Sequence, residues 1–205
     1  MSDHRITQIS QTRKGRFAVF VDGAFAFSMS LEDLVRHDLT EDVTLNDQDL
    51  EEYRSISGMD KCRAKAINLL SYREHSHHDL AVKLQRSFDE ETALFIADEC
   101  RENGLVDDVR FGTLLAQELY TLRHYGPLRL REELSKHGLS RGDTQQVLDE
   151  CAFDFEESAL LALQEKYGDW MNGQKEKVRA VNGMYRLGYT AVQTMAAMGS
   201  EGDLD

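Results

Sequence analysis

The sequence repeats itself with a period of about fifty residues, and this constrains the fold more than any other feature. Four residues of the first copy recur fifty positions later: Leu69, Arg73, Leu80 and Leu84 match Leu119, Arg123, Leu130 and Leu134. A period of this length, with one small folding unit per copy, is typical of arrays in which each unit buries apolar surface on its neighbour. We therefore expect an elongated, curved array rather than one spherical core.

A third copy follows the second. Beyond Leu84 the offset becomes 51, which pairs Asp-Glu-Cys at 98–100 with Asp-Glu-Cys at 149–151. The core positions of the second copy recur fifty residues on, so that Leu130, Leu134 and Leu139 match Ala180, Met184 and Tyr189. Tyr125-Gly126 matches Tyr167-Gly168 at only 42 residues, so the third copy carries roughly eight extra residues around 169–176.

Each copy predicts three helices. The first helix of the second copy has apolar residues at helical spacing, which predict one buried stripe: Phe111, Leu114, Leu115, Leu119 and Leu122. Pro127, the only proline, suits the first position of the next helix, where an N–H has no partner to lose. Leu130 and Leu134 should then face the core, and Gly138 suits a left-handed cap.

Three segments have the pattern of a capped helix start, in which a Ser or Thr side chain accepts from a backbone N–H three residues later. These segments are Ser76 to Asp79, Ser140 to Asp143 and Thr190 to Gln193. The first should open a second helix, and the other two should open third helices. Each segment lies where the repeat places a helix boundary, so the two patterns agree.

The N-terminal part predicts strands. Phe17, Val19 and Val21 alternate on one face, and the alternation resumes with Phe25 and Phe27 after Asp22-Gly23, a pair suited to a two-residue hairpin. Residues 6–9 predict a third strand, and Ser30 should start a helix. The fold class is therefore mainly α, with a small N-terminal antiparallel β-hairpin or three-strand extension.

These elements divide the chain into four parts. Residues 1–57 form the small sheet with helices, and residues 58–107 and 108–157 form the first two three-helix repeats. Residues 158–205 form the third repeat with an acidic tail.

Basic residues gather on or beside the second helices, although the net charge is −13. Residues 123–141 hold five Lys or Arg and two acidic residues, and residues 175–186 hold four basic residues, Arg186 included, and Glu176. Stacked copies would place these helices in similar orientations, which predicts a basic stripe. The candidate partner-binding residues are Arg123, Tyr125, Arg129, Arg131, Lys136, Lys175, Lys177 and Arg179.

A purely structural interpretation of the same segment stays open. Arg129 with Glu133 and Glu132 with Lys136 have the i, i+4 spacing of ion pairs on a solvated helix face. Tyr125-Gly126-Pro127 can equally pack a tight corner.

No catalytic motif is present: the sequence lacks a phosphate-binding Gly-rich loop, a nucleophile elbow and a plausible Cys/His pair. Its three cysteines form no Cys-x-x-Cys pair, and His75-Ser-His-His78 has no nearby ligand at metal-binding spacing. No apolar run approaches a membrane span, and the N-terminus lacks a signal-peptide stretch. We expect a cytoplasmic protein that is not an enzyme and binds no metal or cofactor.

The chain resembles the RecX family, regulatory proteins of the RecA recombinase. The segments that carry the resemblance are 71–84, 102–119, 123–140 and 177–193, and residues 5–30 are similar to the N-terminal extension of some members. The resemblance implies tandem three-helix repeats that lie in the groove of the RecA–DNA filament. There the family suppresses ATP hydrolysis, strand exchange and repressor cleavage, functions of recombination, DNA repair and the SOS response.

The resemblance further implies that RecA is the partner, that DNA is contacted mainly as part of the RecA–DNA complex, and that the protein has no catalytic residues. We expect it to act as a monomer. Two alternatives stay open: a helical scaffold for another partner, and a helix-turn-helix DNA reader. The third helices, near 89–102 and 141–152, are acidic, which opposes a reader beside phosphates.

Overall fold

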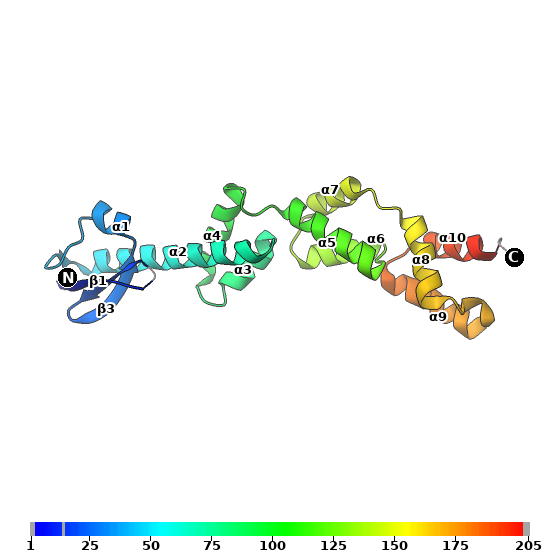
Figure 1. Ribbon diagram of the computed structural model, residues 1–205, viewed down its shortest axis with the longest axis horizontal. Coiled ribbons are helices and arrows are strands. Elements are labelled where there is room, and N and C mark those ends of the chain that lie inside the picture. Colours follow the sequence, from blue (N-terminus) through cyan, green and yellow to red (C-terminus); the bar gives the residue numbers. More distant parts are fainter. Residues whose placement is uncertain (1–2, 14, 203–205) are drawn as a thin grey trace. The chain divides into compact units, whose positions relative to one another are not determined.

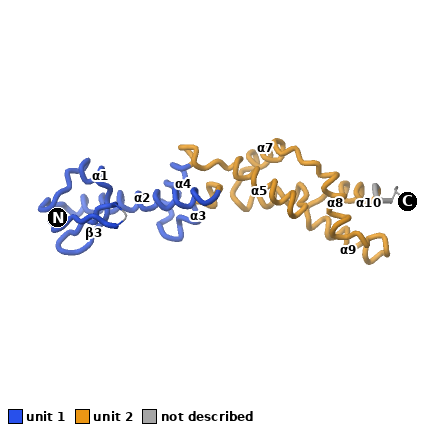
Figure 2. Tube along the Cα trace, in the orientation of Figure 1, with its two compact units in different colours: residues 1–73, 81–100 blue, residues 74–80, 101–205 orange. Residues whose placement is uncertain are grey.

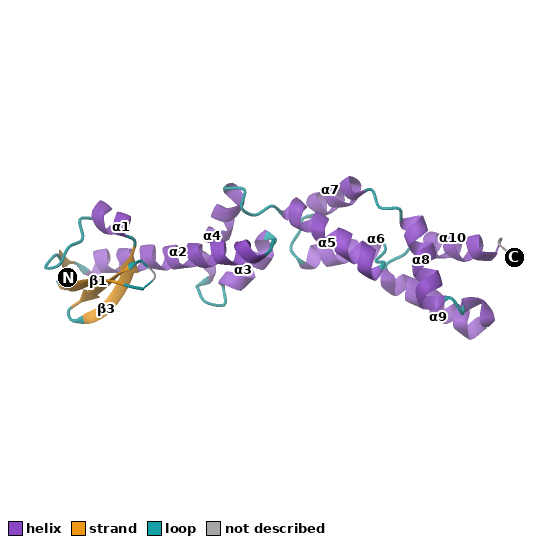
Figure 3. Ribbon diagram, in the orientation of Figure 1, coloured by secondary structure: helices purple, strands orange, loops and turns teal. Residues whose placement is uncertain are grey.

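The computed structural model describes residues 3–13 and 15–202, and the protein is mainly α-helical with a small N-terminal sheet (Figure 1, Figure 3). It divides into two compact units, residues 1–73 with 81–100 and residues 74–80 with 101–205 (Figure 2). Within the described residues, every helix is too short or too polar to cross a membrane. The predicted fold class is confirmed.

The sheet is antiparallel and has four strands in the order β3-β2-β1-β4. Its strands are β1 (His4–Gln11), β2 (Phe17–Val21), β3 (Ala24–Met29) and β4 (Thr44–Leu45). The sequence predicted three of them. It missed β4 because two residues are too few to show an alternating pattern, and only their pairing with His4 and Arg5 makes them a strand.

The predicted hairpin has a bulge that the sequence did not reveal. Asp22 and Gly23 both have positive φ, 52° and 81°, as a two-residue hairpin of this kind requires. Phe20 pairs with Phe25 but Val19 pairs with Phe27, so β3 carries one extra residue. The bulge breaks the alternation. Phe27 is therefore buried while Phe25 is 56% exposed, which corrects the prediction that the two share a face.

Helices α1 (Leu31–Arg36) and α2 (Asp47–Tyr72) cover the apolar face of the sheet. Ser30 caps α1 as predicted, since its hydroxyl accepts from the Asp33 amide at 3.0 Å. The core formed here contains Ile6, Val19, Val21, Phe27, Met29, Leu34, Leu39, Leu45 and Leu50. Helix α2 then continues into the first repeat without a break at 57/58, the position of the expected domain boundary. The four-part division therefore stays a prediction.

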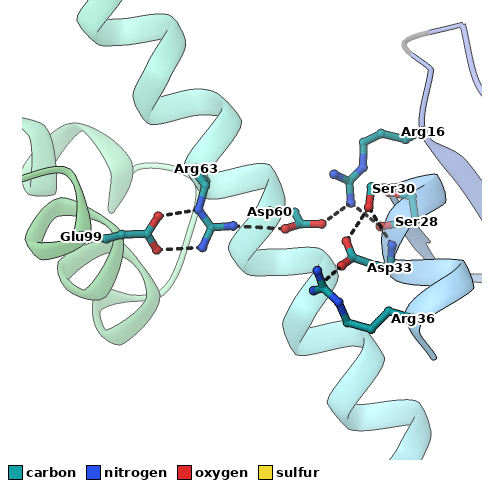
Figure 4. Close-up of polar contacts among 8 residues, drawn as sticks. All are labelled: Arg16, Ser28, Ser30, Asp33, Arg36, Asp60, Arg63 and Glu99. Atoms are coloured by element: carbon teal, nitrogen blue, oxygen red, sulfur yellow. Dashed lines mark hydrogen bonds and ion pairs between the residues drawn. The ribbon is translucent and has the colours of Figure 1, made fainter. Parts of the chain in front are cut away.

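A relay of polar contacts runs along α2 inside the first unit (Figure 4). Arg16 of the sheet region donates to the Ser28 carbonyl oxygen at 2.6 Å and to Asp60 at 3.1 Å. Asp60 in turn accepts from Arg63 at 3.2 Å, and Arg63 donates two hydrogen bonds to Glu99, at 2.6 and 2.7 Å. The relay joins the sheet, α2 and the helix that carries Glu99.

The rest of the chain forms the predicted helices. The first copy contains α3 (His77–Leu84) and α4 (Glu90–Glu102), and the second contains α5 (Asp108–Arg123), α6 (Pro127–Lys136) and α7 (Arg141–Cys151). The third contains α8 (Phe155–Tyr167), the short 3-10 turn η1 (Trp170–Asn172), α9 (Gln174–Leu187) and α10 (Ala191–Gly202). The turn η1 lies in the extra residues, and its Trp170 is buried in the core of this copy.

The second helices use the core positions that the repeat predicts. Leu84, Leu134 and Met184, which match one another in the three copies, are each 0% exposed. After α6, Gly138 adopts a positive φ of 84°, and the Leu139 amide donates to the Leu134 carbonyl oxygen at 3.3 Å. Glycine is favoured there because this left-handed conformation strains residues with a Cβ.

The predicted stripe on α5 is partly wrong. Phe111 is buried, but Leu114 and Leu122 are 52% and 68% exposed. The face of α5 that packs inward runs instead through Phe111, Gly112 and Ala116. A Cβ on Gly112 would lie 2.5 Å from the Leu139 side chain, so close packing at small residues turns Leu114 and Leu122 outward.

Candidate partner-binding surface

The segment around the only proline joins the second and third copies. Gly126 is the N-cap residue of α6 and Pro127 is its first residue, as predicted. The Gly126 amide donates to the Leu187 carbonyl oxygen at 2.7 Å, and the Leu128 amide donates to the Gly188 carbonyl oxygen at 3.1 Å. The C-terminal end of α9 therefore supplies acceptors to the N-terminal end of α6, where helix amides lack partners within their own helix.

This head-to-tail joint requires glycine on both sides. A Cβ on Gly126 would lie 2.6 Å from the carbonyl carbon and oxygen of Gly188. Gly188 has a positive φ of 92°, and a Cβ there would overlap the backbone of Arg129. The helix dipoles also favour the joint, because the partial negative charge at the C-terminal end of α9 lies against the partial positive charge at the N-terminal end of α6.

A related joint lies between α6 and the first turn of α3, both inside the second unit. The Ser76 hydroxyl donates to the His137 carbonyl oxygen at 2.6 Å and accepts from the Asp79 amide at 3.1 Å. A Cβ on Gly138 would overlap the side chain of His78. The histidine-rich segment therefore forms a helix-end contact. The described residues include no group of three or more His, Cys, Asp or Glu side chains placed to hold a metal ion.

Residues of the third copy also bind the end of α5. His124 ends that helix in the left-handed conformation, with φ 54°. Its carbonyl oxygen accepts from the Tyr189 hydroxyl at 3.0 Å, and the Arg123 carbonyl oxygen accepts from Lys166 at 2.8 Å. Burial and the nearby Arg123 charge lower the pKa of Lys166. Tyr125 directly follows His124, so these contacts give the Tyr125-Gly126-Pro127 corner a role in packing.

Two of the candidate cations are engaged within α6. Arg129 contacts Glu133 at 2.7 Å and Glu132 at 2.8 Å, and Lys136 contacts Glu133 at 3.1 Å and Glu132 at 3.0 Å. Burial disfavours the charge of Arg129, but Glu133 and Glu132 outweigh it and raise the pKa of the guanidinium. Hydrogen bonds to Glu132 and Glu133 raise the pKa of Lys136. Both expected i, i+4 pairs are present.

Other candidate cations lack such neighbours. Arg123, Arg131 and Lys175 are exposed, and none of the carboxylates that the structure describes forms an ion pair with them. Arg131 donates a hydrogen bond to the Gln145 side chain, at 2.8 Å. Their charges therefore remain available to a partner.

The two remaining candidates lie in the first half of α9 and contact the turn before it. The ammonium of Lys177 lies 6.0 Å from the centre of the Trp170 ring, and Arg179 pairs with Asp169. These contacts hold the start of α9 against the extra residues of the third copy. Together with Lys175 they form the basic part of α9 that the sequence predicted.

A groove of about 550 Å³ opens at the α6–α9 joint. Tyr125 and Arg129 lie in its wall, so the structure brings these two predicted residues together. The guanidinium of Arg129 also lies 5.5 Å from the centre of the Tyr125 ring. The whole lining is Tyr125, Leu128, Arg129, Glu132, Tyr167, Gly183, Tyr185, Arg186, Leu187 and Gly188.

Sequence reasoning missed Leu128 and Tyr185, and it placed Arg186 in a basic cluster without assigning it to the contact surface. Leu128 and Tyr185 are 55% and 49% exposed in the structure. The fifty-residue offset could have identified Leu128. It aligns Leu128 with Val178, and both lie outside the buried positions Leu130 and Ala180. Apolar residues outside the core positions of a repeat are candidates for a contact surface.

Two family models match the chain. The model described as the regulatory protein RecX N-terminal domain matches residues 4–46, and the model of the first three-helix domain of RecX matches residues 62–99. A regulatory protein RecX from Halorhodospira halophila is 30% identical over 137 residues, which cover 66% of this chain and 84% of the relative. The chain belongs to the RecX family.

Other regulatory proteins named RecX are similar over different lengths of the chain. The protein from Listeria innocua is 29% identical over 211 residues, covering 98% of this chain and 77% of the relative. The protein from Pseudomonas putida is 37% identical over 109 residues, covering 51% of this chain and 67% of the relative. The similarity to RecX proteins therefore extends over almost the whole chain.

Solved RecX structures have the same fold. A crystal structure of a regulatory protein RecX aligns with a TM-score of 0.77 at 19% identity and covers 96% of this chain and 99% of its own. RecX from Lactobacillus salivarius aligns with a TM-score of 0.62 at 16% identity and covers 72% of this chain and 98% of its own.

Proposed function

We propose that this chain binds the RecA recombinase in its filament on DNA and lowers the ATPase, strand-exchange and coprotease activities of the filament. Membership of a family of regulatory proteins supports this proposal. In this role the protein regulates recombination, DNA repair and the SOS response in the cytoplasm. It acts as a monomer, with no cofactor and no catalytic residues of its own.

The contact surface that we propose lies on α6 and α9 with the end of α5. The observation that carries it is that three exposed cations of an acidic protein form no ion pair with any carboxylate in the described part of the chain, namely Arg123, Arg131 and Lys175. A filament offers two anionic targets, acidic protein surface and bound DNA, and salt screens contacts with either. DNA is then contacted as part of the RecA–DNA complex.

The ion pairs decide which residues a test should change. Reversing Arg129 or Lys136 would place a carboxylate beside Glu132 and Glu133 and disturb the helix itself. Arg131 and Lys175 form no ion pair within residues 3–13 and 15–202, so the double variant Arg131→Glu/Lys175→Glu reports on the surface alone. Its thermal unfolding should match that of the wild type, because such surface substitutions change stability by about 0.5 kcal/mol or less.

The experiment measures ATP hydrolysis by RecA on single-stranded DNA against increasing concentrations of this protein. We expect the wild type to lower the rate and the double variant to need a much higher concentration for the same effect. The control variant is Lys65→Glu/Arg86→Glu, which reverses two exposed cations outside the proposed surface. An unchanged RecA rate with the wild type would refute the function, and a double variant as active as the control would refute the surface.

A further inference from the structure

One cation that lines the groove at the α6–α9 joint, Arg186, forms no ion pair with the described residues. The offset of fifty aligns Arg186 with Lys136, whose charge is held by Glu132 and Glu133 one turn earlier on α6. The corresponding positions on α9 are Asn182 and Gly183, which carry no charge. Among the described residues no carboxylate pairs with Arg186, so its guanidinium is free to bind an anion at the groove.

Apolar side chains lie beside this cation without a packing role in the core. Leu128 from α6 and Tyr185 from α9 line the groove, and each exposes about half of its surface. The ring of Tyr167 lies against Gly183, where an added Cβ would overlap it, and it forms another part of the wall. The groove can therefore offer apolar contacts to one side chain of a ligand and the guanidinium of Arg186 to a carboxylate.

The backbone holds the groove open in one shape. The joint is fixed by the hydrogen bonds from Gly126 and Leu128 to the end of α9, and neither glycine leaves room for a shift toward the other. A site that is already formed loses little free energy to ordering when it binds. Its volume of about 550 Å³ suits a few side chains.

The charges of the groove favour a short peptide over a continuous polyanion. Arg186 can bind a carboxylate through two parallel hydrogen bonds. Glu132, which is paired with Arg129 and Lys136, also lines the groove, so a row of phosphates would meet a carboxylate beside the cations. A segment with a single carboxylate beside an apolar residue can place its charge at Arg186 and keep away from Glu132.

We propose that this groove receives a short acidic segment of the partner protein, with a carboxylate on Arg186 and an aromatic or aliphatic side chain between Leu128 and Tyr185. The proposal rests on the proposed function, which makes RecA that partner. The groove then acts as an anchoring pocket, and the exposed cations around it steer the approach.

The test measures binding to RecA filaments on single-stranded DNA for the wild type, Arg186→Glu and the control Lys65→Glu. We expect Arg186→Glu to bind about tenfold more weakly or worse, with unchanged thermal unfolding. Equal binding by all three variants would overturn the groove proposal and leave the proposed function intact. Absence of wild-type binding would refute the proposed function itself, so the two failures differ.

A second measurement identifies what occupies the groove. The photo-crosslinking residue benzoylphenylalanine replaces Tyr185, and as a control it replaces Tyr72, which is 80% exposed on α2. We expect irradiation of the Tyr185 variant to attach RecA through a segment that contains Asp or Glu beside an apolar residue. Attachment to DNA, to a segment without acidic residues, or to RecA equally from position 72 would overturn the proposal.

Discussion

The backbone of Gly126 passes so close to Gly188 that an added Cβ atom would lie 2.6 Å from the Gly188 carbonyl oxygen. We therefore expect Gly126→Ala to separate the ends of α6 and α9 and to cost about 1–3 kcal/mol of stability, the range for overpacking. Thermal unfolding followed by circular dichroism measures the loss.

The matched control for this change is Gly58→Ala. Gly58 lies inside α2 with nothing within 4 Å of an added Cβ, so alanine should stabilise the helix by about 0.5–1 kcal/mol. The two substitutions are chemically identical and have opposite expected signs. A Gly126→Ala protein that unfolds at the wild-type temperature would show that the joint is looser than the structure indicates.

Leu134 should be a major contributor to the core of the second copy, because its side chain is 0% exposed. Leu134→Ala should lower the free energy of unfolding by about 2–5 kcal/mol, from lost burial and the cavity left behind. Leu122→Ala serves as the control, since Leu122 is 68% exposed and its loss should cost about 0.5 kcal/mol or less. Equal melting temperatures for the two variants would contradict the assigned core.

The contact between Glu99 and Arg63 should make stability depend on acid pH. The hydrogen bond from Arg63 lowers the pKa of Glu99 below its ordinary value of 4.5. The carboxylate therefore stabilises the folded state above pH 4.5, and this contribution is lost as the pH falls below that value. Glu99→Gln should be less stable than the wild type at pH 7, and the difference should shrink in acid.

Melting temperatures of both proteins between pH 7 and about pH 3 measure this difference. Glu102→Gln, on the exposed side of the same helix, is the control and should follow the wild type throughout. A gap between wild type and Glu99→Gln that stays constant across the acid range would mean that the charge of Glu99 does not stabilise the fold.

Tyr189 should make the stability of the protein depend on pH in the alkaline range. Burial raises its pKa to about 12, from an ordinary value of 10.0, and its hydroxyl donates to the His124 carbonyl oxygen. The neutral side chain stabilises the fold below pH 10, and this contribution is lost between pH 10 and about 12. Tyr189→Phe should cost about 1 kcal/mol at pH 8.

Urea unfolding at pH 8 and at increasing alkaline pH compares the two proteins. The deficit of Tyr189→Phe should narrow above pH 10 because the wild type then loses its own advantage. Tyr72→Phe, at a residue that is 80% exposed, should behave as the wild type at every pH. A deficit that widens with pH would mean that the hydroxyl is not buried in its neutral form.

The repeated core could be predicted from the sequence because it follows a fixed period. Leu84, Leu134 and Met184 occupy one position of a repeated unit, and burial at one copy implies burial at the others. The capped helix starts at Ser76, Ser140 and Thr190 were predictable for a local reason. Each depends on residues three positions apart.

Contacts between distant residues left no such pattern. Gly126 and Leu187 are far apart in the sequence, so nothing near either residue shows that their backbones meet. The outward turn of Leu114 depends on Gly112 packing against Leu139, a contact that helical spacing does not reveal. For the candidate surface, the sequence identified the cations and the i, i+4 partners of Arg129 and Lys136, but not the pair of Arg179 with Asp169. That the surface binds a partner stays a prediction.

The unbroken length of helix α2 restricts where residues can be inserted or deleted. Tyr53 and Ile56 near its start pack against the core of the sheet, while Arg63, two turns later, binds Glu99. Each helical residue advances the direction of a side chain by about 100°. Deleting one residue between Ile56 and Asp60 would turn the sheet by that angle around the helix axis and take Arg16 away from Asp60. The number of residues in this stretch therefore sets the orientation of the sheet about the axis of α2. We expect the chain to tolerate only insertions or deletions that amount to whole helical turns.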